Sequence, residues 1–526
     1  MPSEALLILT VIFLTALVIH RRTKLRPFAH IPGPPAQSWF MGNLSQVFTP
    51  KGLPFHQHLV DEYGGMVKIH GFFGDEQLYI SDHKALSAIL GKDSDAFDET
   101  AVFFDTNKVI FGPGLVATSG DQHRRQRKLV MPVFSVPHIK ALLPAFYDVA
   151  GRLIDAIQAS LPHTNTILHT IPEDESVVDM SAWMCRAALE TIGQTVLGYS
   201  FDPLSSPITN PYSSAIKELI PTIFSLSLVR QFAPILSRLG SPRMRRWIVE
   251  HTPNAAVQKI KEISDVMHAT AVDVLESRRK EDLGGKDIIS VLLRANEKAP
   301  ENAKMDENEL SGQVTVLIFG AQDTTSSVLS RILYLLAEHP EIQERVRAEV
   351  LPFIGRIEHD ELVALPLLDA VIKETLRLHS PVPFVRRTAT QPRTIAYGES
   401  SQSVFIPTGT TLFISIAGYN RLESIWGADA KVWNPDRFID NHNAKSEGPG
   451  IYAGTLSFLG GPRSCPGWKF ALVEMKIILS SLLREFRFSL VPDARIEWNL
   501  SQIIAPSVVG PDGAEKKGLP LRVERI

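Results

Sequence analysis

Apolar residues recur at helical spacing over much of the chain and predict mainly α-helices. The longest such segment runs from Asp306 to about Glu338, and its first four residues are typical of a helix capping box. A second helix is expected to begin at Pro340, because proline is favoured in the first helical turn. A third is expected over residues 468–486, with apolar positions at Phe470, Val473, Ile477, Ile478, Leu482 and Phe486.

Strand signals are short and scattered. Four segments predict strands, at residues 66–70, 77–80, 404–406 and 411–414. Residues 434–457 contain many turn formers with little periodicity, which predicts an irregular segment wrapped on the core. We therefore expect a mainly α-helical protein with a minor β-sheet.

The most continuous apolar stretch lies near the N-terminus, from Ala5 to Ile19, and is followed by four basic residues within 21–26. It is shorter than the ~20 residues of a full membrane span, so a cleaved signal peptide is the competing interpretation. The acidic residue before the stretch and the basic residues after it favour an uncleaved anchor, with the C-terminal side in the cytosol. We expect a transmembrane signal anchor at residues 1–20 and a basic, Pro/Gly-rich linker at 21–40.

Composition adds few constraints. Apolar residues make up 44% of the chain and charged residues 21%, as expected of a globular protein with a large core. A net charge of −3 gives no general case for nucleic-acid binding. Two cysteines among 526 residues cannot form a disulfide framework, which favours a reducing compartment.

One of those cysteines, Cys465, lies in a segment rich in glycine and proline, directly before the helix expected from residue 468. Unpaired N–H groups and the helix dipole favour a thiolate at such a position. A nucleophile, a redox thiol and a metal ligand are all compatible with it. The absence of a nearby second cysteine in the sequence argues against a C-x-x-C pair and structural zinc, while a buried, inert thiol is the usual fate of a lone cysteine.

The surrounding pattern is Phe-x-x-Gly-x-Arg-x-Cys-x-Gly, at Phe458, Gly461, Arg463, Cys465 and Gly467. It resembles the haem-binding signature of the cytochromes P-450, with every defining position present. The resemblance implies haem b (iron protoporphyrin IX) with the Cys465 thiolate as the proximal iron ligand. It also implies the cytochrome P-450 fold, a single large helical domain with small β regions, over residues 41–526.

Residues 320–325 place an acid and two threonines in the middle of the long helix from Asp306 and are expected to interrupt it. The hydroxyls could simply bond back to the preceding turn. Alternatively, a kink opens a groove for a small ligand and a water. The segment resembles the family's oxygen-activation motif, which implies Asp323 and Thr324 as the acid and alcohol of a catalytic proton relay. Ala321, where the family usually has glycine, is expected to narrow the groove slightly.

Glu374 and Arg377 stand three residues apart on a segment with apolar flanks. Such pairs usually lie on solvated faces. The stretch resembles the family's E-x-x-R helix, and residues 435–438 resemble the segment that supplies a third charge. The resemblance implies a structural network of Glu374, Arg377 and Arg437 behind the haem.

A basic segment from residue 120 to 128 is expected to begin a helix with His123 and Arg127 on one face. A solvated basic face is the default interpretation. The resemblance instead implies that His123 (in place of the usual tryptophan, as in fungal members) and Arg127 bind haem propionates, which need cationic or N–H partners. Arg387 is a further propionate partner, with Arg386 as its rival. The other basic residues form either a docking patch for an acidic electron donor or a solvated surface: Arg124, Arg125 and Lys128.

A pocket lined by apolar residues is expected on the other side of the haem, which implies a lipophilic substrate. Its wall is expected to come from residues 101–116, 207–244 and 503–506, together with Phe319, Val382 and Phe384.

The resemblance as a whole implies a haem-thiolate monooxygenase. Such an enzyme inserts one oxygen atom from O₂ into a lipophilic small molecule by hydroxylation or epoxidation. NADPH supplies electrons through a separate NADPH-cytochrome P-450 reductase, and cytochrome b5 is a second candidate partner. Similarity to membrane-anchored fungal members implies the endoplasmic reticulum membrane, a cytosolic catalytic domain and secondary metabolism such as terpenoid biosynthesis. A haem-thiolate isomerase or dehydratase that uses no O₂, and a non-catalytic haem carrier, stay open.

Overall fold

A computed structural model gives the fold and describes residue 15 and residues 27–161, 176–204, 211–280, 285–400, 402–439 and 448–526. The expected anchor at residues 1–20 lies outside these residues, except for residue 15, and stays a prediction. Across the described residues, no single helix is long and apolar enough to span a membrane. Two pairs of consecutive helices reach that length and apolarity only when both helices of a pair are counted together, and each pair is bent at the break between its helices.

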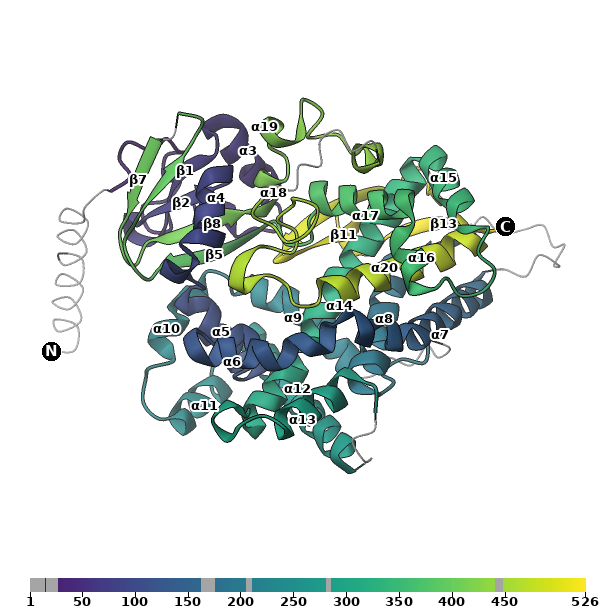
Figure 1. The fold of residues 1–526 in the computed structure, drawn as a ribbon. Helices are drawn as coiled ribbons and strands as arrows, with labels where there is room; N and C mark the ends of the chain where they lie inside the picture. The colour runs from purple at the N-terminus through teal and green to yellow at the C-terminus, as the bar shows by residue number, and fades with distance from the viewer. Residues whose placement is uncertain are drawn as a thin grey trace.

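Helices make up the larger part of the molecule (Figure 1). The described α-helices are α2 (Leu44–Val47), α3 (Leu53–Tyr63), α4 (His83–Ser87), α5 (Ala101–Phe111), α6 (Gly120–Val130), α7 (Val136–Ser160), α8 (Met180–Ile192), α9 (Pro211–Ser225), α10 (Ala233–Leu236), α11 (Pro242–Glu250), α12 (Ala255–Lys280), α13 (Ile288–Glu297), α14 (Glu307–Glu338), α15 (Pro340–Val350), α16 (His359–Ala364), α17 (Pro366–Leu378), α18 (Ile416–Tyr419), α19 (Glu423–Trp426) and α20 (Trp468–Glu485).

The strands form four small sheets. The largest has the order β1-β2-β8-β5-β3 and lies at one end of the molecule, beside α3 and α4 (Figure 1). Its strands are β1 (Met66–His70), β2 (Glu76–Ile80), β8 (Thr411–Ser415), β5 (Phe384–Ala389) and β3 (Phe97–Asp98). The other sheets contain β10 (Arg495–Ser501), β11 (Ile503–Val509) and β12 (Glu515–Lys517); β4 (Val177–Asp179), β13 (Pro520–Arg525) and β9 (Phe486–Leu490); and β6 (Arg393–Tyr397) with β7 (Gln402–Ile406).

These elements confirm a mainly helical protein with small sheets. The Asp306 side chain accepts from the Glu309 N–H, and the Glu309 side chain accepts from the Asp306 N–H, so the predicted capping box begins α14. The helices expected at Pro340 and Trp468 are present as α15 and α20, and each of the four expected strands is present. The pairing of β9 to β13 is an addition that the sequence pattern did not predict.

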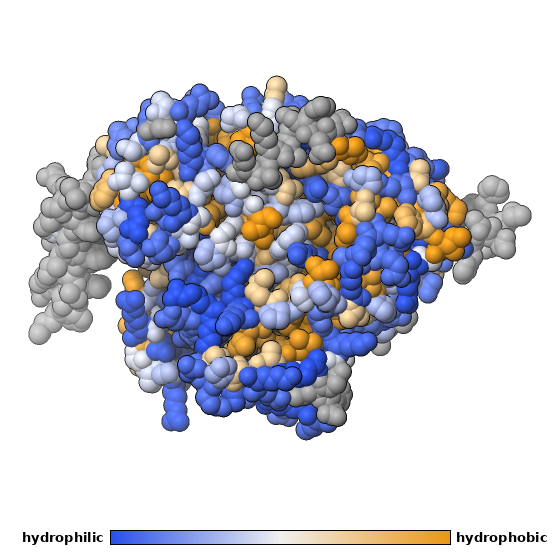
Figure 2. All heavy atoms as spheres, viewed as in Figure 1, coloured by the Kyte–Doolittle hydropathy of each residue, from blue (hydrophilic) through white to orange (hydrophobic). Residues whose placement is uncertain are grey.

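The largest apolar core joins α7, α8, α12, α14 and α20, and a second one joins the five-stranded sheet to α4. α14 passes through the middle of the molecule, between the sheet end and the helical end (Figure 1). Hydrophilic residues cover most of the viewed face, with hydrophobic groups in its centre (Figure 2). A long central helix therefore supplies a rigid wall against which a site can be built.

Candidate active site

A cavity of about 440 Å³ is lined both by the middle of α14 and by the segment that carries Cys465. Its wall is mostly apolar, as predicted for a lipophilic ligand. Several expected residues line it: Phe103, Val116, Phe319, Val382, Phe384 and Ile503. Phe104 and Phe111 lie in the expected segment but do not line the cavity. Cys465 and Thr324 both line it, so one space contains the candidate metal ligand and the candidate alcohol.

The backbone around Cys465 is held by close packing. The Cys465 N–H donates to the Phe458 carbonyl at 2.9 Å, which closes the segment on itself. Gly461 has a φ of +68°, and a Cβ there would lie 1.8 Å from the Leu90 carbonyl oxygen. A side chain at this position would therefore force the loop away from its neighbour.

Cys465 faces the cavity but lies deep within the protein. Burial raises the pKa of its thiol to about 11, although the Gly467 N–H and the Arg127 charge act in the opposite direction. The helix start alone is thus too weak to give the thiolate expected from the sequence, because desolvation of the anion outweighs it. A bound metal cation would reverse this balance, since it stabilises a coordinated thiolate directly.

The wall beside Cys465 carries three nitrogen donors, His123, Arg127 and Arg463. Arg127 donates to the Ser464 carbonyl at 2.9 Å and to its hydroxyl at 3.1 Å, which ties α6 to the cysteine segment. Arg463 forms an ion pair with Asp98 at 2.7 Å. Burial and the charges of Arg463 and Arg127 lower the pKa of His123 to about 4. His123 is therefore neutral at pH 7 and offers one ring N–H.

Arg387 does not line the cavity, whereas Arg386 does. Arg387 is buried, and its Nη1 pairs with Glu99, a cavity residue, at 2.6 Å. Its Nη2 is buried without a hydrogen-bond partner in the described part of the chain. Arg386 donates to Gln231 at 2.7 Å. The two neighbouring arginines thus have different surroundings, and the propionate role of Arg387 stays a prediction.

The middle of α14 differs from the sequence expectation in two respects. The helix is continuous from Glu307 to Glu338, so the predicted interruption is wrong, and Thr324 donates back to the Gly320 carbonyl at 2.8 Å. Gly320 lines the cavity, and a Cβ there would meet nothing within 4 Å, so open space faces this turn. The structure therefore provides the groove through small residues rather than through a break.

Asp323 lies one residue from Thr324 but lines a different cavity, of about 220 Å³. This second cavity is rich in hydroxyl groups and includes Lys517. Burial lowers the pKa of Lys517, and the charge of Asp323 opposes that effect. The predicted acid and alcohol thus stand on two sides of one helical turn. Ile503 borders both cavities.

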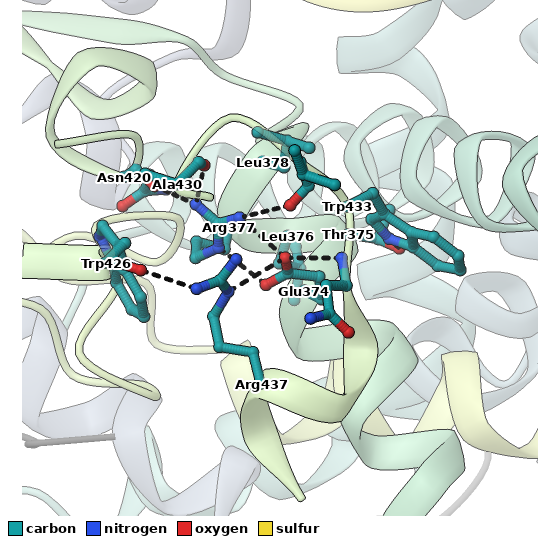
Figure 3. A network of polar contacts seen from close by, with 12 residues as sticks. Glu374, Thr375, Leu376, Arg377, Leu378, Asn420, Trp426, Ala430, Trp433 and Arg437 are labelled. Atoms are coloured by element: carbon teal, nitrogen blue, oxygen red, sulfur yellow. Dashed lines mark hydrogen bonds and ion pairs between the residues drawn. The ribbon is translucent and has the colours of Figure 1, made fainter. Parts of the chain in front are cut away.

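Glu374, Arg377 and Arg437 form the predicted network, and all three are buried (Figure 3). Arg377 makes two hydrogen bonds to the Glu374 carboxylate, at 2.7 and 2.8 Å, and Arg437 approaches the same carboxylate at 3.3 Å. The remaining guanidinium nitrogens donate to the carbonyls of Asn420, Ala430 and Trp426, among others. The network therefore fixes the irregular segment that follows α18 and α19 against α17.

Only part of the candidate docking patch of Arg124, Arg125 and Lys128 is exposed to solvent. Arg124 and Lys128 are exposed, but Arg124 pairs with Asp121. Arg125 is half-buried and pairs at 2.5 Å with Glu309, at the start of α14. Arg125 therefore joins α6 to α14 and is not a free surface charge.

The residues present fit haem, the group that the sequence resemblance implies. Cys465 offers a thiol, and Arg127, Arg463 and His123 offer donors for two carboxylates, beside a mostly apolar space. Within the described residues, no three His, Cys, Asp or Glu side chains come together as a metal site. Cys465 is the one thiol that lines this cavity among the described residues, and it would be the protein ligand of the haem iron.

Several polar cavity residues were not recognised in the sequence as ligand contacts, among them Glu99, Arg230 and Gln502. Arg230 has a signal that could have found it, because it is the single charged residue between Leu219 and Leu236. A lone arginine within an apolar segment needs a partner. Gln502, at the turn between β10 and β11, has a φ of +73°, which no local pattern predicts.

Comparisons with known proteins agree with this site. The family model for cytochrome P-450 matches residues 32–510. The chain is 39% identical to cytochrome P-450 monooxygenase 91 of Postia placenta, over 97% of both chains. It is 34% identical to a ganoderic acid synthetase of Ganoderma lucidum, again over 97% of both chains. It is 31% identical to a cytochrome P-450 monooxygenase of Hericium erinaceus, over 98% of this chain and 96% of the other. With the cysteine segment, the central helix and the buried charge network in place, the chain belongs to the cytochrome P-450 family.

Proposed function

We propose that this protein is an NADPH- and O₂-dependent haem-thiolate monooxygenase that hydroxylates or epoxidises a lipophilic small molecule. The observation that carries the proposal is that Cys465 and Thr324 line the same apolar cavity. In this cavity Cys465 would hold the haem, and Thr324 would offer a hydroxyl for the proton transfers that O₂ activation needs. The acid–alcohol pair disfavours the alternative in which no O₂ is used.

When bound through Cys465, haem supplies the reductive activation of O₂. For a hydroxylation, substrate C–H, O₂, NADPH and one proton give the alcohol, water and NADP⁺. We propose that the electrons come from a separate reductase, as is general for the cytochrome P-450 family. Arg127 and Arg463 would neutralise the haem propionates beside Cys465, and His123 would donate its ring N–H to them.

Proton delivery is assigned to Asp323 and Thr324. The Thr324 hydroxyl donates to the Gly320 carbonyl, so its oxygen is free to accept from a water in the cavity. Asp323 borders the hydroxyl-lined second cavity, where water can reach its carboxylate. We infer that Asp323 takes protons from that side and that a movement of its side chain around the helical turn delivers them, through water, to Thr324 Oγ1.

Turnover under ¹⁸O₂ tests this function. The full chain is reconstituted with haem, a P-450 reductase and NADPH, and lipophilic candidates are screened for products by mass spectrometry. We expect one ¹⁸O atom per oxidation event and no label from H₂¹⁸O. Turnover that proceeds without NADPH and O₂ would identify the isomerase or dehydratase alternative.

For the substrate we propose only a broad chemical class, and for the pathway only a general type. The name of the Ganoderma lucidum relative says that it is a synthetase of ganoderic acid. Together with the apolar cavity, this relative supports secondary metabolism, with a terpenoid as substrate. Co-expression with neighbouring biosynthetic genes, followed by product analysis, checks it; oxidation of only short-chain or polar compounds would count against it.

We propose attachment to the endoplasmic reticulum membrane with a cytosolic catalytic domain. Besides the apolar stretch within residues 5–19, exposed apolar side chains lie on and near α10 and α11: Phe232, Ile235, Leu236, Leu239, Met244 and Trp247. Ring contacts of 5.3 Å join Phe232 to Phe72 and Phe72 to Phe40, so the patch extends to the linker. Protection from protease added outside sealed microsomes would contradict a cytosolic domain.

A further inference from the structure

Apart from Arg127, which bonds to Ser464, two arginines that line the cavity have no carboxylate partner among the described residues. Arg230 lies in the 3-10 helix Val229–Phe232, and Arg386 lies on β5. Glu99, the carboxylate on the same wall, pairs with Arg387 at 2.6 Å. Within the described part of the chain, neither Arg230 nor Arg386 forms an ion pair. The wall therefore carries more positive than negative charge.

Neutral groups hold both guanidiniums. Arg386 donates to the side-chain oxygen of Gln231 at 2.7 Å, and its guanidinium carbon lies 5.2 Å from the Phe48 ring centroid. Arg230 approaches the Gln502 side-chain oxygen at 3.5 Å, and its Nε is buried with no partner among the described residues. These contacts orient the guanidiniums without neutralising them, and of the two the Glu99 charge acts only on Arg386.

Burial disfavours both charges. It lowers the pKa of Arg230 to about 10 and that of Arg386 to about 9, where the Arg230 charge adds to the effect. Both side chains still carry a proton at pH 7. Two buried cations near each other are costly unless an anion joins them, and a carboxylate can accept hydrogen bonds from both.

These arginines are distinct from the donors beside Cys465. The charges that act on His123 are those of Arg463, Arg127, Asp98 and Arg124. The charges that act on Arg386 are those of Arg230 and Glu99. Glu99 lies between these sets, since the charges of both Arg463 and Arg386 act on it. The cavity thus has two neighbouring cationic groups, and we assign the one beside Cys465 to the propionates of a haem.

We propose that the lipophilic substrate carries a carboxylate, which binds to Arg230 and Arg386. This inference rests on the proposed monooxygenase function and specifies its substrate class. An acid anchored at these arginines leaves its apolar part to lie against the apolar lining, which includes Phe103, Phe319 and Phe384.

The test compares acids with their methyl esters on the haem-loaded full chain at pH 7.4. Palmitic, abietic and oleanolic acids and their esters are titrated by the substrate-induced change in haem absorption and by calorimetry. For at least one pair we expect the acid to bind about tenfold more tightly or better, because the ester loses the charge-assisted hydrogen bonds. A wild-type protein that prefers the ester in every pair, or shows no preference in any, overturns the proposal.

Arg230→Gln and Arg386→Gln should each abolish most of the acid preference while leaving ester affinity within about twofold. Arg230→Lys should retain part of the preference, because it keeps the charge. Arg238→Gln removes an exposed positive charge from the same region, outside the cavity, and should change nothing. An acid preference that survives both glutamine substitutions contradicts the proposal.

Failure of this inference is distinguishable from failure of the proposed function. The carbon monoxide spectrum of the reduced protein reports haem-thiolate ligation in every variant. Ester oxidation with NADPH and O₂ reports monooxygenase activity without requiring a carboxylate. A protein that oxidises esters but shows no preference for acids is a monooxygenase whose arginines serve another purpose.

Discussion

At the scale of single residues, two adjacent side chains in the segment after α19 are expected to contribute very different amounts to the stability of the fold. Arg437 is buried against Glu374, while Asp436 forms an exposed pair with Arg345 at 2.6 Å. A buried carboxylate that loses a partner keeps its desolvation cost. An exposed pair is screened by water and contributes little.

Arg437→Ala should therefore lower the free energy of unfolding by about 3–5 kcal/mol. Asp436→Ala, the matched control, should lower it by at most about 1 kcal/mol. Urea unfolding followed by circular dichroism measures both. Equal losses in the two variants would show that the network around Glu374 is not the stabilising unit.

The buried His56 side chain should make the free energy of unfolding depend on pH. Its ring lies between Tyr79 Oη at 3.0 Å and the Val47 carbonyl at 3.1 Å, and burial lowers its pKa to about 4. Between pH 6.5 and 4 the unfolded chain binds the additional proton, so stability falls as the pH falls through this window. The loss at pH 4 is about 3 kcal/mol, and His56 adds no pH dependence above pH 7.

Thermal unfolding at pH 7.5, 6.5 and 5.5 checks this prediction. His56→Gln keeps a donor for Val47 and an acceptor for Tyr79 but does not titrate, so its melting temperature should fall less between pH 7.5 and 5.5 than that of the wild type. Parallel decreases for the two proteins would remove His56 as the cause.

At the scale of elements, one carboxylate at the start of α14 both caps that helix and joins it to α6. One Glu309 oxygen completes the capping box with Asp306. The other accepts from Gln122 at 2.6 Å, Gln126 at 2.9 Å and Arg125 at 2.5 Å, all on α6. A single buried carboxylate thus fixes the central helix to the helix that carries His123 and Arg127.

Glu309→Ala should lower the free energy of unfolding by about 3 kcal/mol, because it leaves buried donors on α6 without a partner. Asp306→Ala removes only the N-cap bond and should cost about 1 kcal/mol. Chemical denaturation of the two variants compares them. A larger loss for Asp306→Ala would show that the contact between α6 and α14 does not depend on Glu309.

Elements with local signals could be predicted from the sequence. The capping box and Pro340 depend on residues within one turn, and α14 and α15 begin where these residues indicate. The hairpin of β10 and β11 could not be predicted from the sequence. Buried and exposed residues alternate only in part along its strands, and β11 packs against α14, which is distant in the sequence. The continuous course of α14 past Gly320 was also missed, since each hydroxyl and acid there is compatible with either a kink or a helix.

At the scale of the whole molecule, the site combines local and distant information. Cys465 and its glycines could be recognised because they form one short segment. The partners of the charged residues could not be predicted from the sequence. Arg463 pairs with Asp98 and Arg387 with Glu99, and about 300 residues or more separate the members of each pair in the sequence. Likewise, only the folded chain separates Asp323 from the cavity that Thr324 lines.

The central claim is that Cys465 is the thiolate ligand of a haem in this cavity. The absorption spectrum of the reduced, carbon monoxide-bound protein tests it most directly. The wild type should show the spectrum of thiolate ligation, Cys465→Ala should lose it, and Cys185→Ala, the other cysteine of the chain, should keep it. A thiolate spectrum that persists in Cys465→Ala, or that disappears in Cys185→Ala, would contradict the account.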